Sequence, residues 1–307
     1  MLGYVLRRLA GAIPTVFIIV TIAFFMIRLA PGGPFDLERP LDPLIMENIN
    51  RTYNLDKPLW QQYYLYLGNL AQGDLGPSFT RRDFSVVDLF RTGLPVSIQL
   101  GGTALAIALV VGAFLGALAA LRQNTWVDYM VVGTATLGIT IPTFVIAPVL
   151  SLFFGVMMGW LPAGGWGGGR WQYLVLPVAT LALPQIAIIA RLTRGATIEA
   201  LRSNHVRTAR AYGLPSYVVV GVHALRAAIL PVVSYLGPTA AALLTGSVVV
   251  ETIFGIPGIG RYFVQGALGR DYTLVMGTVI VIAMFVILFN LIVDILYAVL
   301  DPRVRYD

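Results

Sequence analysis

The sequence contains no cysteine, two histidines and a single lysine among its 307 residues. Without cysteine there can be no disulfide bond, thiolate zinc site or iron–sulfur cluster, and two histidines are too few to form a metal site alone. The one lysine, Lys57, is followed by Pro58, so the phosphate-binding motif G-x-x-x-x-G-K-[ST] cannot occur. No cofactor or metal is therefore expected, and any ATP hydrolysis that drives this protein must come from another chain.

Charged side chains are also scarce. They make up 12% of the residues, against about 25% in soluble domains, while 57% of the residues are hydrophobic. Several windows of about 20 residues or more hold almost no ionisable group, and a helix of that length spans a bilayer. The composition excludes an ordinary soluble enzyme and predicts an all-α integral membrane protein with several spans.

Six transmembrane helices are predicted. The first uncharged run, Leu9–Ile27, is interpreted as a helix rather than a signal peptide, because it is long for a signal core and no small-x-small cleavage pattern follows. Prolines lie in or near several spans, which favours kinked helices around a pathway. The other predicted spans cover residues 94–121, 129–158, 173–190, 227–250 and 273–300.

The distribution of basic residues predicts the orientation in the membrane. The short connections on one side carry eleven arginines, and those on the other side carry three. Because short cytoplasmic loops are enriched in lysine and arginine, both termini should be cytoplasmic. The net charge of +6 reflects this bias and requires no nucleic-acid partner.

The segment after the first span, residues 30–93, is too long for a simple linker and is expected to be a partly folded external loop. Asp42 before Pro43, and Asp56 before Lys57-Pro58, are typical of helix starts. A stripe with the spacing i, i+3, i+4, i+7 predicts an amphipathic helix that ends near Gly73. We interpret the stripe as packing against the membrane domain, with partner docking as the alternative; its members are Trp60, Tyr63, Tyr64 and Leu67.

The basic cytoplasmic loop, residues 191–226, is the most informative segment. Ser203 is expected to cap a short helix that begins at Asn204, and Gly213 before Leu214-Pro215 predicts its end. Ala209 and Gly213 are four residues apart and should share a face with small side chains, which would let another protein approach closely. Positive-inside topology and a capping glycine explain the same residues without a partner.

Residues 207–214 read Arg-Thr-Ala-Arg-Ala-Tyr-Gly-Leu and are followed by His223-Ala224-Leu225 and Leu230-Pro231. This pattern resembles the EAA loop of ABC-importer permeases in its peptide-transporter form. Further matching segments extend the resemblance over nearly the whole chain, to the B-type permeases of bacterial oligopeptide ABC importers: residues 28–32, 73–76, 251–254, 257–260, 270–272 and 301–303.

The resemblance implies a type I ABC importer permease fold that carries oligopeptides across the bacterial inner membrane. It also implies the partners: a second, homologous permease in a heterodimer, two cytoplasmic ATPase subunits, a periplasmic peptide-binding protein and membrane lipid. Three parts are expected: an N-terminal helix (1–29), the external loop (30–93) and a transmembrane domain (94–307). The implied ATPase-coupling residues are Arg207, Thr208, Ala209, Arg210, Ala211, Gly213 and Leu214.

The predicted coupling segment departs from the general family pattern at two positions. Arg207 and Thr208 stand where the general family pattern has glutamate and alanine, so the role of that glutamate is not transferred to Arg207. Two alternatives to oligopeptide import stay open. The cargo could be dipeptides, nickel or another small ligand, or the protein could be an autonomous secondary transporter. The absence of a credible intramembrane ion site weighs against the second alternative.

A few polar residues lie within the predicted spans. Asn290 and Asp294 share a face of the last helix, where we expect helix packing or pairing with an arginine. Thr140, Thr143 and Gln185 are candidates for lining the pathway, although threonine commonly bonds its own helix backbone.

Overall fold

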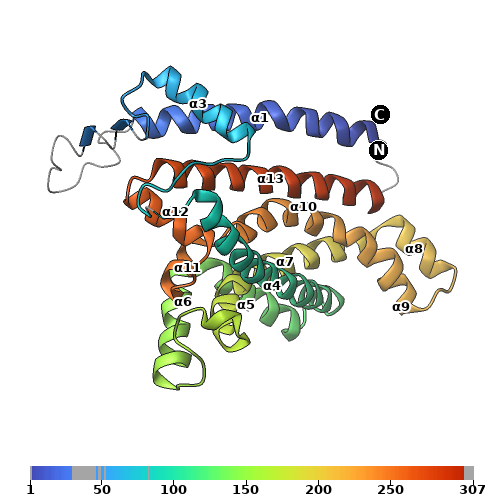
Figure 1. Cartoon of the computed structure of the whole chain (residues 1–307). Helices are drawn as coiled ribbons and strands as arrows, with labels where there is room; N and C mark the ends of the chain where they lie inside the picture. Colours follow the sequence, from blue (N-terminus) through green and yellow to red (C-terminus); the bar gives the residue numbers. More distant parts are fainter. Residues whose placement is uncertain (1, 30–45, 48–49, 52, 82, 301–307) are drawn as a thin grey trace.

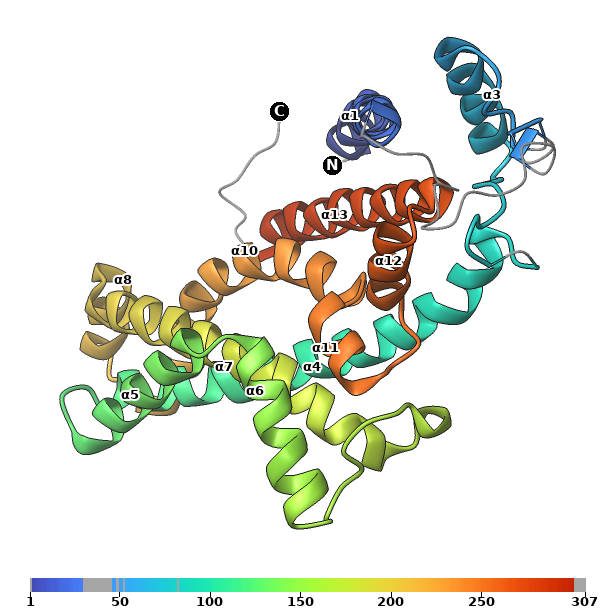
Figure 2. The same ribbon diagram turned by 90° about the vertical axis from the view of Figure 1, so that its left-hand side faces the viewer.

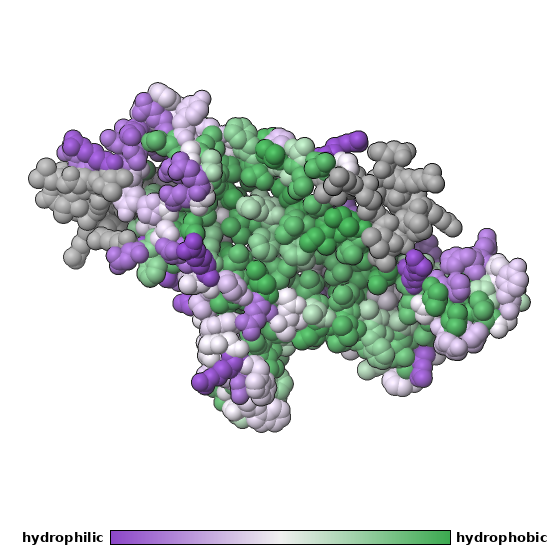
Figure 3. All heavy atoms as spheres, turned by 45° about the vertical axis from the view of Figure 1, so that its right-hand side comes forward, coloured by the Kyte–Doolittle hydropathy of each residue, from purple (hydrophilic) through white to green (hydrophobic). Residues whose placement is uncertain are grey.

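The computed structural model describes residues 2–29, 46–47, 50–51, 53–81 and 83–300. Within them the chain is helical and has no named strand. The long helices run side by side, with α8 and α9 at one end of the molecule and α3, α11 and α12 toward the other (Figure 1). A hydrophobic band crosses the middle of the surface, and hydrophilic residues gather toward its ends (Figure 3).

The connections between the later helices, from α7 onward, are short, whereas longer segments separate α1 from α3, α3 from α4 and α6 from α7. Two π-helical segments, Ser151–Met157 and Val219–Ala224, continue α6 and join α9 to α10. The α-helices are α1 (Leu2–Leu29), α3 (Leu59–Ala71), α4 (Val86–Leu121), α5 (Trp126–Thr140), α6 (Thr143–Leu150), α7 (Trp171–Arg202), α8 (Asn204–Ala211), α9 (Ser216–Val218), α10 (Leu225–Leu244), α11 (Val248–Phe254), α12 (Ile259–Leu268) and α13 (Tyr272–Leu300).

Among the described residues, five helical stretches are long and apolar enough to cross a membrane: Leu6–Leu29, Val86–Leu121, Trp171–Arg202, Ser216–Phe254 and Tyr272–Tyr297. The helix pair Trp126–Thr140 and Thr143–Met157 makes a sixth if its two arms count as one span. These stretches correspond to the six predicted spans, so the all-α, multi-span expectation is confirmed.

The predicted span 129–158 is not a continuous helix. Its two arms, α5 and α6, meet at a bend of 100°. Pro142 disfavours helical backbone at the preceding residue, and Ile141 is extended, with φ −82° and ψ 119°. The proline was visible in the sequence, but the size and direction of the bend depend on packing.

Helix α4 begins eight residues before the predicted start at position 94. Ser85 and Asp88 form a reciprocal capping box, in which the Ser85 hydroxyl accepts from the Asp88 backbone N–H at 3.1 Å and the Asp88 carboxylate accepts from the Ser85 N–H at 3.3 Å. Two otherwise unpaired backbone donors are thereby satisfied, which stabilises the earlier start. Helix α7 likewise continues to Arg202, beyond the predicted end at residue 190.

Small residues allow α4 to lie very close to α7 and α10. A β-carbon added at Gly112 would lie 2.8 Å from the Ile189 side chain, and one at Gly116 would lie 2.4 Å from the Ala190 carbonyl oxygen, both on α7. On the α10 side, a β-carbon at Gly101 would lie 2.0 Å from the Leu243 carbonyl oxygen. Without a hydrophobic driving force between helices in lipid, such close contact is a principal source of association.

Helix α1 packs on α13, and α3 lies against the end of both. Phe24 and Val20 of α1 are buried with Met276 and Ile280 of α13. Near the other end of α1, the Arg8 guanidinium donates to the Asp294 carboxylate, with Nε at 2.7 Å. The expected pairing of Asp294 with an arginine is therefore confirmed.

Helix α3 corrects two expectations for the external loop. Pro58, rather than Asp56, occupies the N-cap position, and no side chain caps the helix there. Of the predicted stripe, Tyr63 and Leu67 pack against α1, whereas Trp60 and Tyr64 are 59% and 68% exposed. The buried face is instead completed by Tyr66 and Gln62, and Asp42 lies outside the described residues.

The contact between α4 and α10 predicts different effects for two adjacent glycines. Gly101→Ala should destabilise the fold by about 1–3 kcal/mol, because its methyl group has no room against the Leu243 carbonyl. In Gly102→Ala the added methyl carbon would lie 3.4 Å from its nearest atom, so this substitution should leave the stability of the fold unchanged or slightly increase it. Thermal unfolding of both variants in detergent checks this, and equal melting temperatures would contradict the packing argument.

Candidate functional site

The candidate site in the basic loop is helix α8, which follows α7 after a single extended residue. Ser203, with φ −68° and ψ 156°, breaks the helix, and α8 begins at Asn204 as expected. The predicted Ser203 side-chain cap is absent, because its hydroxyl donates to the Ala200 carbonyl oxygen at 2.5 Å instead. The break therefore turns the chain without a side-chain cap on the new helix.

Gly213 ends α8 as predicted. Its φ of +74° lies in the left-handed region. The Gly213 N–H donates to the Arg210 carbonyl at 2.9 Å, and the Leu214 N–H donates to the Ala209 carbonyl at 3.3 Å. This pair of bonds is the Schellman motif. A β-carbon at Gly213 would meet no atom within 4 Å, so the surrounding space is open.

The prediction that Ala209 and Gly213 share an exposed face is wrong. Ala209 is 5% exposed and lies in a small core with Val206, Val219 and Ala224. Gly213 has already left the helix, so it no longer follows the four-residue periodicity. The small side chain of Ala209 thus serves packing within the chain. Asn204 and His205 at the start of α8 are exposed, as are the other proposed coupling residues: Arg207, Thr208, Arg210, Ala211, Gly213 and Leu214.

A buried ion pair ties α7 to α5. Arg194 donates from Nε to one oxygen of Asp128 at 2.5 Å and from a terminal nitrogen to the other oxygen at 2.7 Å. The Asp128 side chain is 1% exposed and also accepts the Asn124 backbone N–H at 3.0 Å. Such bidentate, charge-assisted bonding fixes distance and orientation together. Sequence reasoning missed this pair, because residues 66 positions apart leave no periodic signal.

The three candidate pathway residues occupy two different environments. Thr140 and Thr143 flank the bend between α5 and α6, and the Thr140 hydroxyl donates to the Thr136 carbonyl of its own helix at 2.8 Å. Gln185 of α7 accepts a hydrogen bond from the Tyr235 hydroxyl of α10. Backbone bonding by Thr140 and cross-helix bonding by Gln185 are the structural roles that these residues have in this conformation.

A second buried carboxylate, Glu251 of α11, holds the opposite end of the helix bundle. It is fully buried and accepts hydrogen bonds from the Ser97 hydroxyl at 2.7 Å and from the Arg261 backbone N–H at 3.1 Å. The Ser97 oxygen in turn accepts from the Ile259 N–H at 2.9 Å. A β-carbon at Gly258 would lie 2.3 Å from the Glu251 carboxyl carbon, so this turn closes tightly on the carboxylate.

Comparison with known proteins identifies the family to which this chain belongs. Residues 112–306 match the family described as the inner membrane component of binding-protein-dependent transport systems, and residues 1–99 match its N-terminal part. The chain belongs to this family. The permease is 52% identical over 306 residues to the oligopeptide transport system permease protein OppB of Haemophilus influenzae and 53% identical to that of Escherichia coli strain K12, over the full length of both chains in each case. It is 41% identical to the dipeptide transport system permease protein DppB of Bacillus subtilis, over 99% of this chain and 98% of the relative.

Solved structures share the fold of the permease. An inward-facing structure of the MetNI methionine ABC transporter matches with a TM-score of 0.59 and 18% identity, over 70% of this chain and 97% of that chain. An amino acid ABC transporter crystallised with histidines matches with a TM-score of 0.54 and 19% identity, over 68% and 93% of the two chains. These likenesses confirm the importer-permease architecture.

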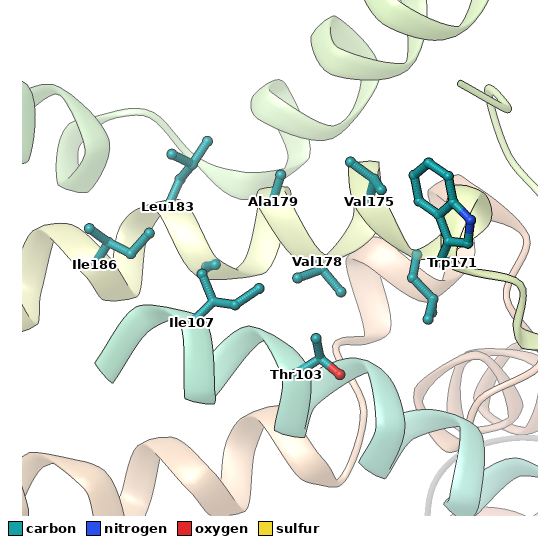
Figure 4. Close-up of a pocket in the computed structure, with 10 residues that line it drawn as sticks. Thr103, Ile107, Trp171, Val175, Val178, Ala179, Leu183 and Ile186 are labelled. Carbon is teal, nitrogen blue, oxygen red and sulfur yellow. The ribbon is translucent and has the colours of Figure 1, made fainter. Parts of the chain in front are cut away.

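An apolar groove runs between α4 and α7 and has a volume of about 440 Å³ (Figure 4). Thr103, Ile107 and Trp171 lie along it with aliphatic residues of α7, and none of the lining residues is ionisable. Among the described residues there is also no cluster of three metal-ligating side chains.

The Asp128–Arg194 pair predicts a non-additive stability effect. Arg194→Gln leaves Asp128 buried without a counter-ion and should cost about 3 kcal/mol, at the low end for a broken buried pair because Arg194 is 27% exposed. Adding Asp128→Asn should restore most of the loss. The measurement is thermal unfolding of the single and double variants, with Arg191→Gln at an exposed position of α7 as control. Additive losses would contradict the pairing.

Proposed function

We propose that this chain is one permease subunit of an ATP-binding-cassette importer and forms half of an oligopeptide pathway across the bacterial inner membrane. The observation that carries the proposal is α8, an exposed basic helix fixed to the end of α7 by a small buried core. A rigid cytoplasmic helix of this kind is suited to receiving movement from another protein. Full-length similarity to oligopeptide permeases supports the choice of cargo.

The contacts suggest a route for the movement. Val206 and Ala209 hold α8 against the end of α7, so a displacement of α8 is passed to that helix. Arg194 then links α7 to Asp128 of α5, which leads to the bend at Pro142. In this proposal, closure of the ATPases changes the angle between these helices and alternates access to the pathway. Thr140, Thr143 and Gln185 are the candidates for lining it.

The partners are proposed from the family to which the chain belongs. Its sequence holds no phosphate-binding loop, so ATP hydrolysis is assigned to two separate cytoplasmic ATPases. A second, homologous permease completes the pathway as a heterodimer, and a periplasmic binding protein delivers the peptide. The proposed coupling residues are the exposed ones on α8 and its C-terminal turn, with Ala209 acting through packing. The expected parts were 1–29, 30–93 and 94–307; because α4 begins at Val86, we propose the second boundary before that residue.

Peptide length is the finer point of the proposal. Identity is 52–53% to the named oligopeptide permeases and 41% to the dipeptide permease from Bacillus subtilis, and coverage is nearly complete in all cases. Oligopeptides are therefore preferred over dipeptides as cargo. Competition of uptake by peptides of two to six residues, in the reconstituted complex, would measure this preference directly.

The coupling role of Gly213 is tested by Gly213→Asn. Asparagine tolerates the left-handed backbone, and the space around Gly213 is open, so the chain should fold and insert normally. If an ATPase cleft lies against this turn, the added side chain should reduce ATP-driven uptake by about tenfold or more through lost docking energy of at least about 1.4 kcal/mol. Uptake, ATPase stimulation and ATPase pull-down are measured per inserted permease.

The matched control is Gly73→Asn. Gly73 has φ +77° and also no atom within 4 Å of an added β-carbon, but it follows α3 in the external loop. Both variants therefore impose the same backbone demand at opposite ends of the molecule. Loss of uptake in Gly213→Asn alone supports coupling. Equal uptake in both would reduce Gly213 to a helix stop and remove it from the coupling surface.

The proposed orientation places α8 in the cytoplasm and α3 outside. Because the chain has no cysteine, single cysteines can be introduced at the exposed positions Arg207 and Gln72 without interfering thiols. A membrane-impermeant thiol reagent applied to intact spheroplasts should label Gln72→Cys, and it should label Arg207→Cys only after the membrane is opened. Labelling of both positions from the same side would overturn the topology.

A further inference from the structure

A small polar pocket lies where the end of α1 meets α3 and the start of α13. Its volume is about 120 Å³, several times the space needed by one water molecule. Figure 2 shows α1 nearly end-on, lying outside α13 and away from α4, α5 and α7. No residue of α5, α6 or α7, where the pathway candidates lie, lines the pocket. The lining residues that matter here are Arg28, Gln62, Leu65, Tyr66, Asn69 and Thr273.

Arg28 brings a positive charge to this pocket. Its Nε donates to the Gln62 side-chain oxygen at 2.8 Å, and its guanidinium lies 3.9 Å above the Phe24 ring and 5.7 Å from the Tyr272 ring. No carboxylate of the described residues lies within ion-pair distance of Arg28. Aromatic faces stabilise the cation but accept no conventional hydrogen bond from its remaining N–H groups.

Tyr66 adds a second donor. Its side chain is 9% exposed, and its buried hydroxyl has no hydrogen-bond partner among the described residues. Burial raises the pKa of Tyr66 to about 12, so the phenol remains protonated at neutral pH. A buried hydroxyl without an acceptor is unfavourable, and native proteins retain few such groups.

Several acceptors near this pocket are engaged by other donors. Asp271 accepts hydrogen bonds from Ser78, Thr80 and Thr273, including the Ser78 hydroxyl at 2.5 Å. Asp74 accepts the Gly76 backbone N–H at 2.8 Å. The Gln62 amide nitrogen donates to the carbonyl oxygens of Leu55 and Lys57, at 3.3 and 2.8 Å. Among the described residues, Arg28 donates one hydrogen bond, to Gln62, and the Tyr66 hydroxyl makes none, so the pocket still presents donors from both groups.

We propose that this pocket receives a carboxylate, presented by an acidic side chain of the soluble binding protein that docks on the external face. A carboxylate accepts from a guanidinium through two oxygens, and a phenol can supply a third donor. The pocket is large enough for the end of one acidic side chain, and Leu65, which lines it, is 43% exposed. Because none of the proposed pathway helices lines the pocket, the cargo peptide is not expected to supply the carboxylate. This inference rests on the proposed importer function.

The test uses the assembled transporter in nanodiscs and the purified binding protein as the probe. Tyr66→Phe removes only the hydroxyl. With no ligand it would be neutral or stabilising, because a buried unpaired donor disappears. A docked carboxylate instead predicts about tenfold weaker affinity for the binding protein, together with weaker ATPase stimulation at subsaturating concentrations. The control is Tyr64→Phe on the same helix, whose side chain is 68% exposed and should have no effect.

Arg28→Lys provides a second variant that keeps the charge and removes the planar fork, and it should also weaken binding. Unchanged affinity in Tyr66→Phe and Arg28→Lys would overturn the proposal. Loss of the assembled heterodimer in these variants would also overturn the proposal, because the acceptor would then belong to the second permease. An effect of the variants that depends on phosphatidylglycerol in the nanodisc would overturn it as well, because the acceptor would then be a lipid. If no binding protein stimulates the wild-type complex, the importer function itself fails, which is a distinct result.

Discussion

Helix α4 lies so close to α7 and α10 that three of its residues, Gly101, Gly112 and Gly116, have no room for a β-carbon. In a bilayer, helices gain little by leaving lipid for one another, so this contact has to supply much of the association energy. The contact also fixes where the other helices can lie. Helix α5 packs on α7, and α13 packs on α10. The positions of α5 and α13 therefore depend on the close contacts that the glycines of α4 make with α7 and α10.

Buried carboxylates then determine the positions of the connecting segments. Asp128 joins α5 to α7, Glu251 joins α11 to α4 and to the start of α12, and Asp271 joins the segment before α4 to α13. Each has its oxygens satisfied by several donors, which offsets the large cost of burying a charge. Packing thus holds the long helices, while individual hydrogen-bonded acids hold the parts between them.

The sequence predicted features that depend on local chemistry. Apolar runs located the six spans, Gly213 marked the end of α8, and Asp294 was expected to find an arginine. Features that depend on tertiary contacts were missed or misplaced. Ala209 was assigned to an exposed face because the helical period alone cannot say which side is covered. The partners of Asp128 and Glu251 lie 66 and 154 residues away, and no pattern in one sequence links such positions.

Helix α7 runs unbroken from Trp171 to Arg202 although it contains Pro177 and Pro184. Its 32 residues give a rod about 48 Å long at about 1.5 Å per residue. For a rigid helix, the displacement of one end that a given tilt around the other end produces increases with the length of the helix. A tilt of about 10° around one end would sweep the other end through about 8 Å, given that length. A rotation that barely disturbs the packing at one end is then large enough at the other to open or close a passage for a peptide chain.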